Sequence, residues 1–497
     1  MKRIKYIFLS LGVILLIAAC KDFLVTTPKN GTVTDASFFK TTADFDAYIF
    51  GAYADMAGSF DGAGLGNWVK VQCFISQEGW GPDQIPKPLA QYMNATNDQI
   101  TSFWKTFFTM NAKANQVLVK LKDATIPEAD KTRLEGEALF FRGFAYFNLG
   151  RAYGKVPLLL KPYDPTQNYI GCTSEDSIWI QVIADLSAAV TKMPTRTQLG
   201  SEQLGRATKG TALAYLANAY MYKKDWTNAE IAANSLIALG EYGLMPTVRS
   251  VFSSTTENNK ESIFEVQYRD IADGKINWSG HEVGGVLPEY TSPRNIGADY
   301  APAGGWGEIV GTRKLADSFE PGDDRRKELI KVPGEKYKGE FMKDSLLIPL
   351  DVAQPNSSFS TKYWLGPSSD LTVSYLFKLN NPVMRYAEFL LNYAEILFMK
   401  GKTSEGYAQM NLVRNRAKLP SLIATTDQAT FMTALMNERR HELNFEPNLW
   451  FHYTRTGTAA AFLLKEYGIT MKPAWYKFPV PQAERDQNPN LCQNDGY

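Results

Sequence analysis

The sequence has very little histidine and cysteine, and this scarcity argues against several kinds of catalytic and metal site. Only 3 His and 4 Cys occur among 497 residues. No Cys-x-x-Cys pair and no Cys/His ligand spacing is present, so we expect no metal site. His441-Glu442 is not followed by the second histidine of a zincin helix, because Phe445 stands at that position. With no GxSxG motif and no P-loop either, we predict a protein without catalytic residues or cofactor.

An excess of charge of either sign is also lacking. The chain holds 53 Lys+Arg and 52 Asp+Glu, a formal net charge of +1, and loss of its first 19 residues would leave a mature chain at −2. Such a balance attracts a phosphate backbone weakly, so we expect no nucleic-acid partner. Aromatic residues are plentiful at 13%, with 10 Trp and 25 Tyr. This surplus leaves some of them available for binding surfaces.

Long apolar runs are lacking except at the N-terminus. The basic stretch MKRIK precedes YIFLSLGVILLIAA, which is too short to span a bilayer well. The run ends at Ile17-Ala18-Ala19-Cys20, which has the form of a bacterial lipobox. We therefore predict a lipoprotein signal peptide over residues 1–19 and a lipid anchor on Cys20, the first residue of the mature chain. The alternative is an ordinary secretory signal followed by an incidental cysteine.

Three cysteines remain once Cys20 carries the lipid, namely Cys73, Cys172 and Cys492. An oxidising compartment permits one disulfide among them, and the sequence does not choose the pair.

Helical periodicity recurs in pairs along the chain. The best-defined pair spans residues 205–240, where Leu216, Tyr220 and Ala229 fall at tetratricopeptide-repeat spacing. Thr227 and Glu230 predict a capping box at the start of its second helix. Other helices are expected at about 43–56, 100–122, 134–154, 178–193, 383–417 and 429–445. The prediction is a mostly α fold of four helical hairpins with little β structure.

Two stretches without helical period interrupt this frame. Residues 58–98 and 241–380 are rich in glycine, proline and aromatic residues, with one strand pattern at 261–268. Long loops of this kind are usually functional. We therefore predict one domain over 20–497, whose frame (about 43–240 and 383–420) carries two loop-rich insertions and is followed by a C-terminal segment (421–497).

The order of these motifs resembles the SusD/RagB family of Bacteroidetes outer-membrane lipoproteins. The resemblance rests on the lipobox and on four later segments: FFRGFAYFNLGRAYGKVPLL (140–159), RYAEFLLNYAEILFMKG (385–401), ERRHELNFE (438–446) and the closing FPVPQAERDQNPNLCQNDGY (478–497). Cys492 departs from the family's pattern. The resemblance implies a right-handed superhelix of four tetratricopeptide-like units. It also implies a lipoprotein on the outer membrane, facing the cell exterior, that delivers an oligosaccharide, or in some relatives a peptide, to a SusC-like TonB-dependent transporter without performing chemistry.

Candidate ligand-binding residues lie in the two insertions. Sugar rings have apolar C–H faces and a rim of hydroxyls, so exposed aromatic planes beside amides, carboxylates and arginine would bind them. Trp80 and Asp83 lie in SQEGWGPD (76–83), and the later insertion contributes Trp278, Tyr290, Arg294 and Trp306. Trp80 is the first choice and Trp306 the second, with loop packing as the alternative for each. Trp104, Trp226 and Trp450 lie on helical patterns and are expected to be structural.

Two charged motifs invite a chemical interpretation and also permit a structural one. ERRHELNFE could form a general acid/base cluster, but an Arg–Glu network that braces the last long helix explains it better. Asp323-Asp324 is expected to start a helix rather than to bind calcium. A glycoside hydrolase with two carboxylates and a pure protein-docking scaffold are the competing hypotheses for the whole chain.

Overall fold

The computed structural model describes residues 38–57, 64–81, 88–164, 169–268, 285, 287–294, 305–338, 346–348, 356–364 and 379–497. The lipobox with Cys20, and two predicted ligand residues, Asp83 and Trp278, lie outside this set. None of the helices described is long and apolar enough to cross a membrane.

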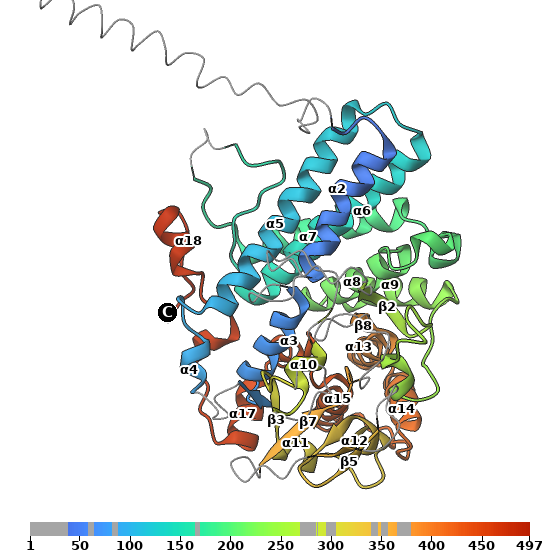
Figure 1. The fold of residues 1–497 in the computed structure, drawn as a ribbon, viewed down its shortest axis with the longest axis vertical. Helices are drawn as coiled ribbons and strands as arrows, with labels where there is room; N and C mark the ends of the chain where they lie inside the picture. The colour runs from blue at the N-terminus through green and yellow to red at the C-terminus, as the bar shows by residue number, and fades with distance from the viewer. Residues whose placement is uncertain are drawn as a thin grey trace, which may run out of the picture.

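A stack of paired helices forms the frame of the molecule (Figure 1). Each pair packs on the next, because α5 also contacts α6, α7 contacts α8, and α9 contacts α13. The mostly helical fold is therefore confirmed, whereas the right-handed sense of the superhelix stays a prediction. The four pairs are α2 (Thr42–Ala57) with α5 (Asp98–Lys120), α6 (Glu128–Tyr153) with α7 (Glu175–Lys192), α8 (Lys209–Tyr222) with α9 (Trp226–Ala238), and α13 (Tyr386–Met399) with α14 (Thr403–Arg416).

Close packing within the frame depends on small residues. On α6, Gly136 and Gly143 face α7, and a Cβ at these positions would lie 2.9 Å from Lys192 Cβ and 3.0 Å from Leu186 Cγ. The two helices can therefore approach more closely than larger side chains would allow. Buried aromatic rings fill the space on other sides of α6, with Phe144 5.0 Å from Tyr215 between ring centroids.

The hairpin α8–α9 is capped differently from the prediction. Asp225, rather than Thr227, caps α9, because its carboxylate accepts a hydrogen bond from the Asn228 backbone N–H at 3.1 Å. The predicted capping box is therefore wrong. Thr227 lies inside the helix and accepts a hydrogen bond from Lys400 at 2.8 Å, and Glu230 pairs with Lys402 at 2.5 Å. Both side chains thus join the third helix pair to the fourth.

The first insertion is more helical than the sequence suggests. It contains α3 (Gly64–Ile75), β1 (Gly79–Trp80) and α4 (Leu89–Tyr92). Helix α3 packs on α5, and the ring centroids of Trp68 and Phe107 lie 4.8 Å apart. The loop prediction is wrong over α3 because tertiary burial of its apolar side chains outweighs the glycines at its start.

The second insertion contains short strands and helices rather than an unbroken loop. The predicted strand at 261–268 is confirmed as β2, which pairs with β8 in antiparallel fashion, and a four-stranded sheet has the order β1-β3-β7-β4. The elements of the second insertion are β2 (Ser262–Val266), α10 (Leu287–Thr291), β3 (Val310–Thr312), α11 (Arg313–Asp317), α12 (Asp324–Leu329), β4 (Ile330–Lys331), β5 (Lys336–Tyr337), β6 (Leu346–Leu347) and β7 (Ser357–Ser360). After the insertion, β8 (Asn381–Arg385) leads directly into α13.

The C-terminal segment closes the lower part of the molecule in Figure 1 and returns toward α5. Its helices are α15 (Gln428–Leu443), α16 (Leu449–Arg455), α17 (Ala459–Tyr467) and α18 (Gln482–Gln487), so the predicted helix at 429–445 is confirmed. Short 3-10 turns lie at η1 (Leu121–Asp123), η2 (Arg196–Gln198), η3 (Ser201–Gln203), η4 (Arg249–Phe252) and η5 (Pro473–Tyr476).

The motif ERRHELNFE is part of a buried ion network. Glu442 accepts hydrogen bonds from Arg325 at 3.2 Å, Arg385 at 2.9 Å and Arg416 at 2.6 Å. Burial raises the pKa of Glu442, but these guanidinium groups outweigh it and hold the pKa well below its usual range. Asp323 caps α12 and accepts from the Arg325 backbone N–H at 2.9 Å, which confirms the predicted helix start. The structural interpretation of both motifs is therefore correct.

Candidate functional site

Helix α10 and the segment 305–309 lie side by side and bring two predicted aromatic residues together. The backbone N–H groups of residues 306, 307 and 309 donate to carbonyls of the α10 segment: Trp306 to Glu289 at 2.9 Å, Gly307 to Ser292 at 3.0 Å, and Ile309 to Tyr290 at 2.8 Å. The Tyr290 and Trp306 ring centroids are consequently 5.8 Å apart, with the planes inclined at 51°.

Glycines on both sides set the position of Trp306. Gly305 has a φ of +72°, and a Cβ there would lie 2.1 Å from the Pro293 carbonyl oxygen. Gly307 also has a positive φ, +59°. Residues with a side chain rarely adopt these angles, which explains why glycine stands directly before and directly after Trp306. Trp306 is only partly buried between them.

Charged groups surround this aromatic pair. Arg294 is exposed, and its Nε donates to the Trp306 carbonyl at 2.8 Å. From α3, the ammonium of Lys70 pairs with Glu308 at 2.7 Å and lies 5.3 Å from the centroid of the Tyr290 ring. Lys70 and Glu308 were missed by the sequence prediction. The sequence offered no signal for either residue, because the segment that holds Lys70 was predicted to be a loop.

Trp80 does not present the exposed plane that we predicted. Its side chain is only 7% exposed and packs in a small cluster with Val310, Tyr337, Ile348, Phe359 and Trp364. The cause is strand pairing, because β1 pairs with β3 and places Trp80 opposite Val310. Tyr290 is also buried, at 8% exposure. The expectation of exposed stacking faces is therefore wrong for both residues.

The same pairing nevertheless joins the two insertions. Strand β3 begins at Val310, directly after the segment that holds Trp306, and β1 ends at Trp80. Residues separated by more than two hundred positions thus form one region, which we call the Trp306 site: Lys70, Tyr290, Arg294, Trp306 and Glu308.

The chemistry of the Trp306 site is that of a binding surface. It combines a partly exposed indole with a guanidinium, an ammonium and a carboxylate, a set that can contact the apolar face and the hydroxyl rim of a polar ligand. No cluster of three or more His, Cys, Asp or Glu residues that could hold a metal ion occurs among the residues described.

Comparison with known proteins places the chain in a family. Residues 260–497 match the model of the SusD family, and residues 51–221 match a second model, described as starch-binding associating with outer membrane. The chain belongs to the SusD/RagB family. It is 27% identical to SusD-like protein P2 of Formosa agariphila over 522 aligned positions that cover 100% of both chains.

Solved structures of SusD-like proteins share the fold. A SusD-like protein from Bacteroides fragilis is similar with a TM-score of 0.78 and 23% identity, covering 95% of this chain and 100% of that one. Surface glycan-binding protein A from Bacteroides thetaiotaomicron, in complex with laminarihexaose, has a TM-score of 0.74 and 22% identity, covering 92% of this chain and 100% of that one. At these identities the similarity establishes the fold alone.

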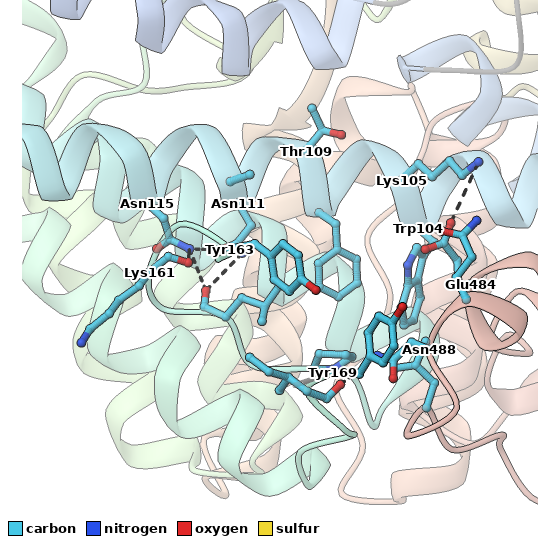
Figure 2. Close-up of a pocket in the computed structure, with 17 residues that line it drawn as sticks. Trp104, Lys105, Thr109, Asn111, Asn115, Lys161, Tyr163, Tyr169, Glu484 and Asn488 are labelled. Carbon is cyan, nitrogen blue, oxygen red and sulfur yellow. Dashed lines mark hydrogen bonds and ion pairs between the residues drawn. The ribbon is translucent and has the colours of Figure 1, made fainter. Parts of the chain in front are cut away.

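A concave region of this SusD-family chain lies beside α5, away from the residues of the Trp306 site (Figure 2). This groove has a volume of about 570 Å³ and is bounded by α5, the connection between α6 and α7, and α18. Tyr163 and Tyr169 line it from the connection, with 51% and 50% of their surfaces exposed. The sequence prediction missed this groove. Tyrosines in a proline-rich connection were the only signal.

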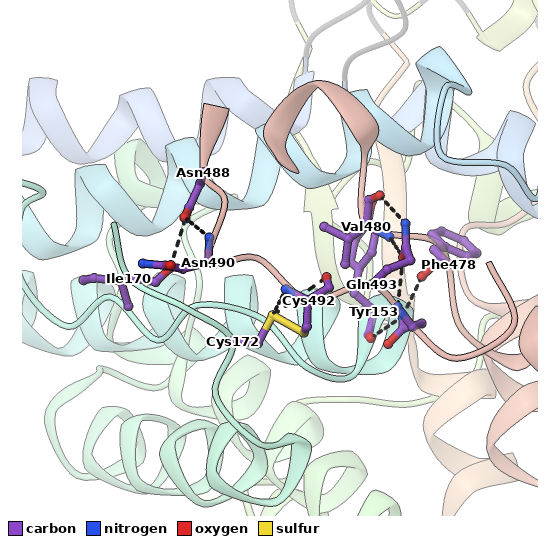
Figure 3. Close-up of a disulfide and its surroundings, with 10 residues drawn as sticks. Tyr153, Ile170, Cys172, Phe478, Val480, Asn488, Asn490, Cys492 and Gln493 are labelled. Atoms are coloured by element: carbon purple, nitrogen blue, oxygen red, sulfur yellow. Dashed lines mark hydrogen bonds between the residues drawn. A yellow bond between two sulfur atoms is a disulfide. The ribbon is translucent and has the colours of Figure 1, made fainter. Parts of the chain in front are cut away.

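A disulfide joins Cys172 to Cys492 (Figure 3), close in sequence to Ile170 and Leu491, which line the groove. The two Cα atoms are 6.0 Å apart, at a sequence separation of 320. Cys73 is buried and free. The pairing left open by the sequence is thereby resolved. Beside the disulfide, Asn488 Nδ2 donates to the Ile170 carbonyl at 3.0 Å and Asn490 Nδ2 to the Tyr169 carbonyl at 2.7 Å.

Proposed function

We propose that this chain is a non-catalytic lipoprotein of the outer membrane that binds an oligosaccharide or polysaccharide at the cell surface. In this proposal it delivers the glycan to a partner SusC-like TonB-dependent transporter. A lipid on Cys20 anchors the chain, and the binding face looks outward from the cell. Binding of a peptide in the same import role is the alternative.

The observation that carries the proposal is the arrangement of the Trp306 site. Two glycines with positive φ hold a partly exposed tryptophan, and Arg294 lies beside it in an exposed position. A pyranose ring can stack its C–H face on an indole while its hydroxyls contact charged side chains at the rim. The Lys70–Glu308 ion pair adds a donor and an acceptor beside the Tyr290 ring.

The relatives support a glycan as the ligand. The second matching family is described as starch-binding, and a structure with the same fold holds laminarihexaose. Both names describe glucose polymers, so glucans are the first ligands to test. Asp83 and Trp278 remain predicted contacts. The buried Trp80 would support the site through the β1–β3 pairing.

Affinity electrophoresis of the mature chain without its lipid-carrying Cys20, residues 21–497, tests the ligand class. We expect starch, laminarin or another neutral polysaccharide in the gel to slow its migration, without release of reducing ends on prolonged incubation. Unchanged migration with every polysaccharide would contradict the glycan proposal, and binding of a peptide mixture would then favour the alternative. Sustained release of reducing ends would contradict the non-catalytic part.

A further inference from the structure

In the part of the chain that the structure describes, exposed aromatic side chains are rare and most of them lie in one place. Among the residues described, three aromatic side chains are close to half exposed, namely Phe50, Tyr163 and Tyr169. Two of the three line the groove beside α5. Leaving two large rings exposed to water in one concavity has an energetic cost, and such exposed apolar patches mark binding sites.

The groove has three walls of different character. Trp104 and Phe108 on α5 form an aromatic wall, with ring centroids 4.7 Å apart. Figure 2 shows Tyr169 near Trp104 and Asn488, and Tyr163 toward the Asn111 and Asn115 end of the groove. The connection that carries Tyr163 and Tyr169 forms the second wall. Polar side chains of α18 and the residue after it, including Glu484 and Asn488, form the third wall. The volume of about 570 Å³ is in the range of ligand-binding clefts.

The backbone that carries the two tyrosines is fastened along both sides. Asn115 Nδ2 donates to the Leu159 carbonyl at 2.8 Å, and Tyr146 Oη accepts from the Leu159 backbone N–H at 2.5 Å. Beyond Tyr169, the disulfide and the Asn490 hydrogen bond hold the connection against the C-terminal segment. The backbone shortly before Tyr163 and the backbone of Tyr169 are therefore both held by hydrogen bonds. A preorganised surface loses less conformational entropy when it binds.

We infer that this groove is a second carbohydrate-binding site, which takes further sugar rings of the same glycan. The inference rests on the proposed function. Tyrosine combines an apolar face with a hydroxyl, and amide and carboxylate groups lie in the third wall, so the groove matches the two-sided chemistry of a pyranose. Its charged side chains are Lys105, Lys161 and Glu484, with Lys105 4.0 Å from Glu484. These side chains sum to a single positive charge, which is too little to hold a strongly anionic chain, so neutral saccharides are the first ligands to test.

Two sites on one chain would act together on a polymer. The second binding event on the same glycan is intramolecular, so affinity for a long chain exceeds that for a short one without any new contact.

A protein partner is the other class of occupant that the groove could have. The concave shape and the narrow set of polar groups fit a ligand cleft better than a protein–protein interface, which buries a larger area on each partner.

The test uses the mature chain and two pairs of probes, laminarihexaose with laminarin and maltohexaose with starch. The double variant Tyr163→Ala/Tyr169→Ala removes the exposed rings, and Phe50→Ala is the matched control because Phe50 does not line the groove. For the glucan that binds, we expect two hexasaccharides per wild-type chain and one per double variant. Polymer affinity should fall about tenfold in the double variant and stay within twofold in the control.

The outcomes separate this inference from the proposed function. If the double variant keeps wild-type stoichiometry and polymer affinity while Trp306→Ala loses binding, the groove inference is overturned and the proposed function stands. If only the double variant loses binding, the groove stands and the Trp306 site fails. Absence of binding to all four probes by the wild-type chain overturns the groove inference. Loss of transporter co-purification by the double variant, with glycan binding intact, reassigns the groove to a protein partner and also overturns it.

Discussion

A buried carboxyl group near α16 connects protein stability to pH. Glu388 accepts a hydrogen bond from Asn448 Nδ2 at 2.9 Å, and its Oε1 lies 3.0 Å from His452 Nε2. Burial raises the pKa of Glu388 to about 7. Burial and the nearby arginines lower the pKa of His452 well below its usual range, so the histidine stays neutral and cannot compensate a charge on Glu388.

We predict that Glu388 makes the folded state less stable as pH rises from about 4.5 to about 7. The folded pKa of about 7 exceeds the ordinary value of 4.5, so the folded state binds the extra proton between these values. The stabilising contribution is complete below pH 4.5 and is lost as pH approaches 7, with a total on the order of 3 kcal/mol. Urea denaturation of wild type and Glu388→Gln at pH 5 and pH 8 measures it. Equal pH dependence in both proteins would contradict the assignment.

The two candidate tryptophans show what local sequence can and cannot predict. Trp80 and Trp306 both lie among glycines, and both were predicted to be exposed. Trp306 is set by its own neighbours, Gly305 and Gly307, so the local sequence was informative. Trp80 is buried by pairing with Val310, a contact between residues far apart in the chain, and no local pattern encodes that contact. Local sequence therefore accounts for the backbone around Trp306 and not for the burial of Trp80, and ligand binding by Trp306 stays a prediction.

At the scale of elements, the disulfide ties the α6–α7 connection to the C-terminal segment. It closes a loop with a sequence separation of 320. In the chain-entropy description, a cross-link across so long a loop stabilises the folded state by about 6 kcal/mol, and the loss on removal of a native disulfide is generally smaller, about 2–5 kcal/mol.

We predict that Cys172→Ser/Cys492→Ser unfolds more easily than wild type by about 3–5 kcal/mol, because the unfolded chain regains the freedom of the closed loop. Denaturant titration without reductant measures the difference. Addition of reductant should destabilise the wild type and leave the double variant unchanged. A double variant as stable as the wild type would show that the Asn488 and Asn490 hydrogen bonds suffice to hold this region.

We predict that removal of one buried carboxylate of the ion network, that of Glu442, strongly lowers the free energy of unfolding. Glu442→Ala leaves Arg325, Arg385 and Arg416 with fewer partners in the interior, and breaking a buried pair in this way costs about 3–5 kcal/mol. The matched control is Asp317→Ala, whose exposed pair with Arg313 is worth less than about 1 kcal/mol. Thermal and urea denaturation compare the two variants. Similar losses in both would contradict a special role for the buried network.

Helices were predictable where apolar residues recur with the helical period, as in α6, α8 and α13. Helix α3 was missed because glycines precede a short apolar run, and its burial against α2, α5 and α16 is a tertiary effect that the local sequence does not show. The α9 cap was displaced from Thr227 to Asp225 because the turn is set by Lys224, which has a φ of +54°. Element boundaries thus depend on turn geometry that the helical period does not contain.

At the scale of the whole molecule, pairing between distant segments fixes the insertions to the helical frame. Strand β2 pairs with β8, which leads directly into α13. Arg440 on α15 donates to Glu78 from Nη2 at 2.8 Å and so ties the turn before β1 to the C-terminal helices. The frame was predictable from repeated local patterns. The Trp306 site and the groove were only partly predictable, because each is assembled from segments brought together by the fold.

Calorimetric titration of the mature chain with the glucan hexasaccharide that binds tests the central claim most directly. We predict saturable heat for the wild-type chain and for Phe50→Ala. For Trp306→Ala we predict at least a tenfold loss of affinity at the Trp306 site, which corresponds to about 1.4 kcal/mol or more. Removal of a partly exposed indole should leave the melting temperature nearly unchanged, which separates lost binding from lost folding. Binding by Trp306→Ala equal to that of the wild type, or no heat from any glycan, would contradict the account.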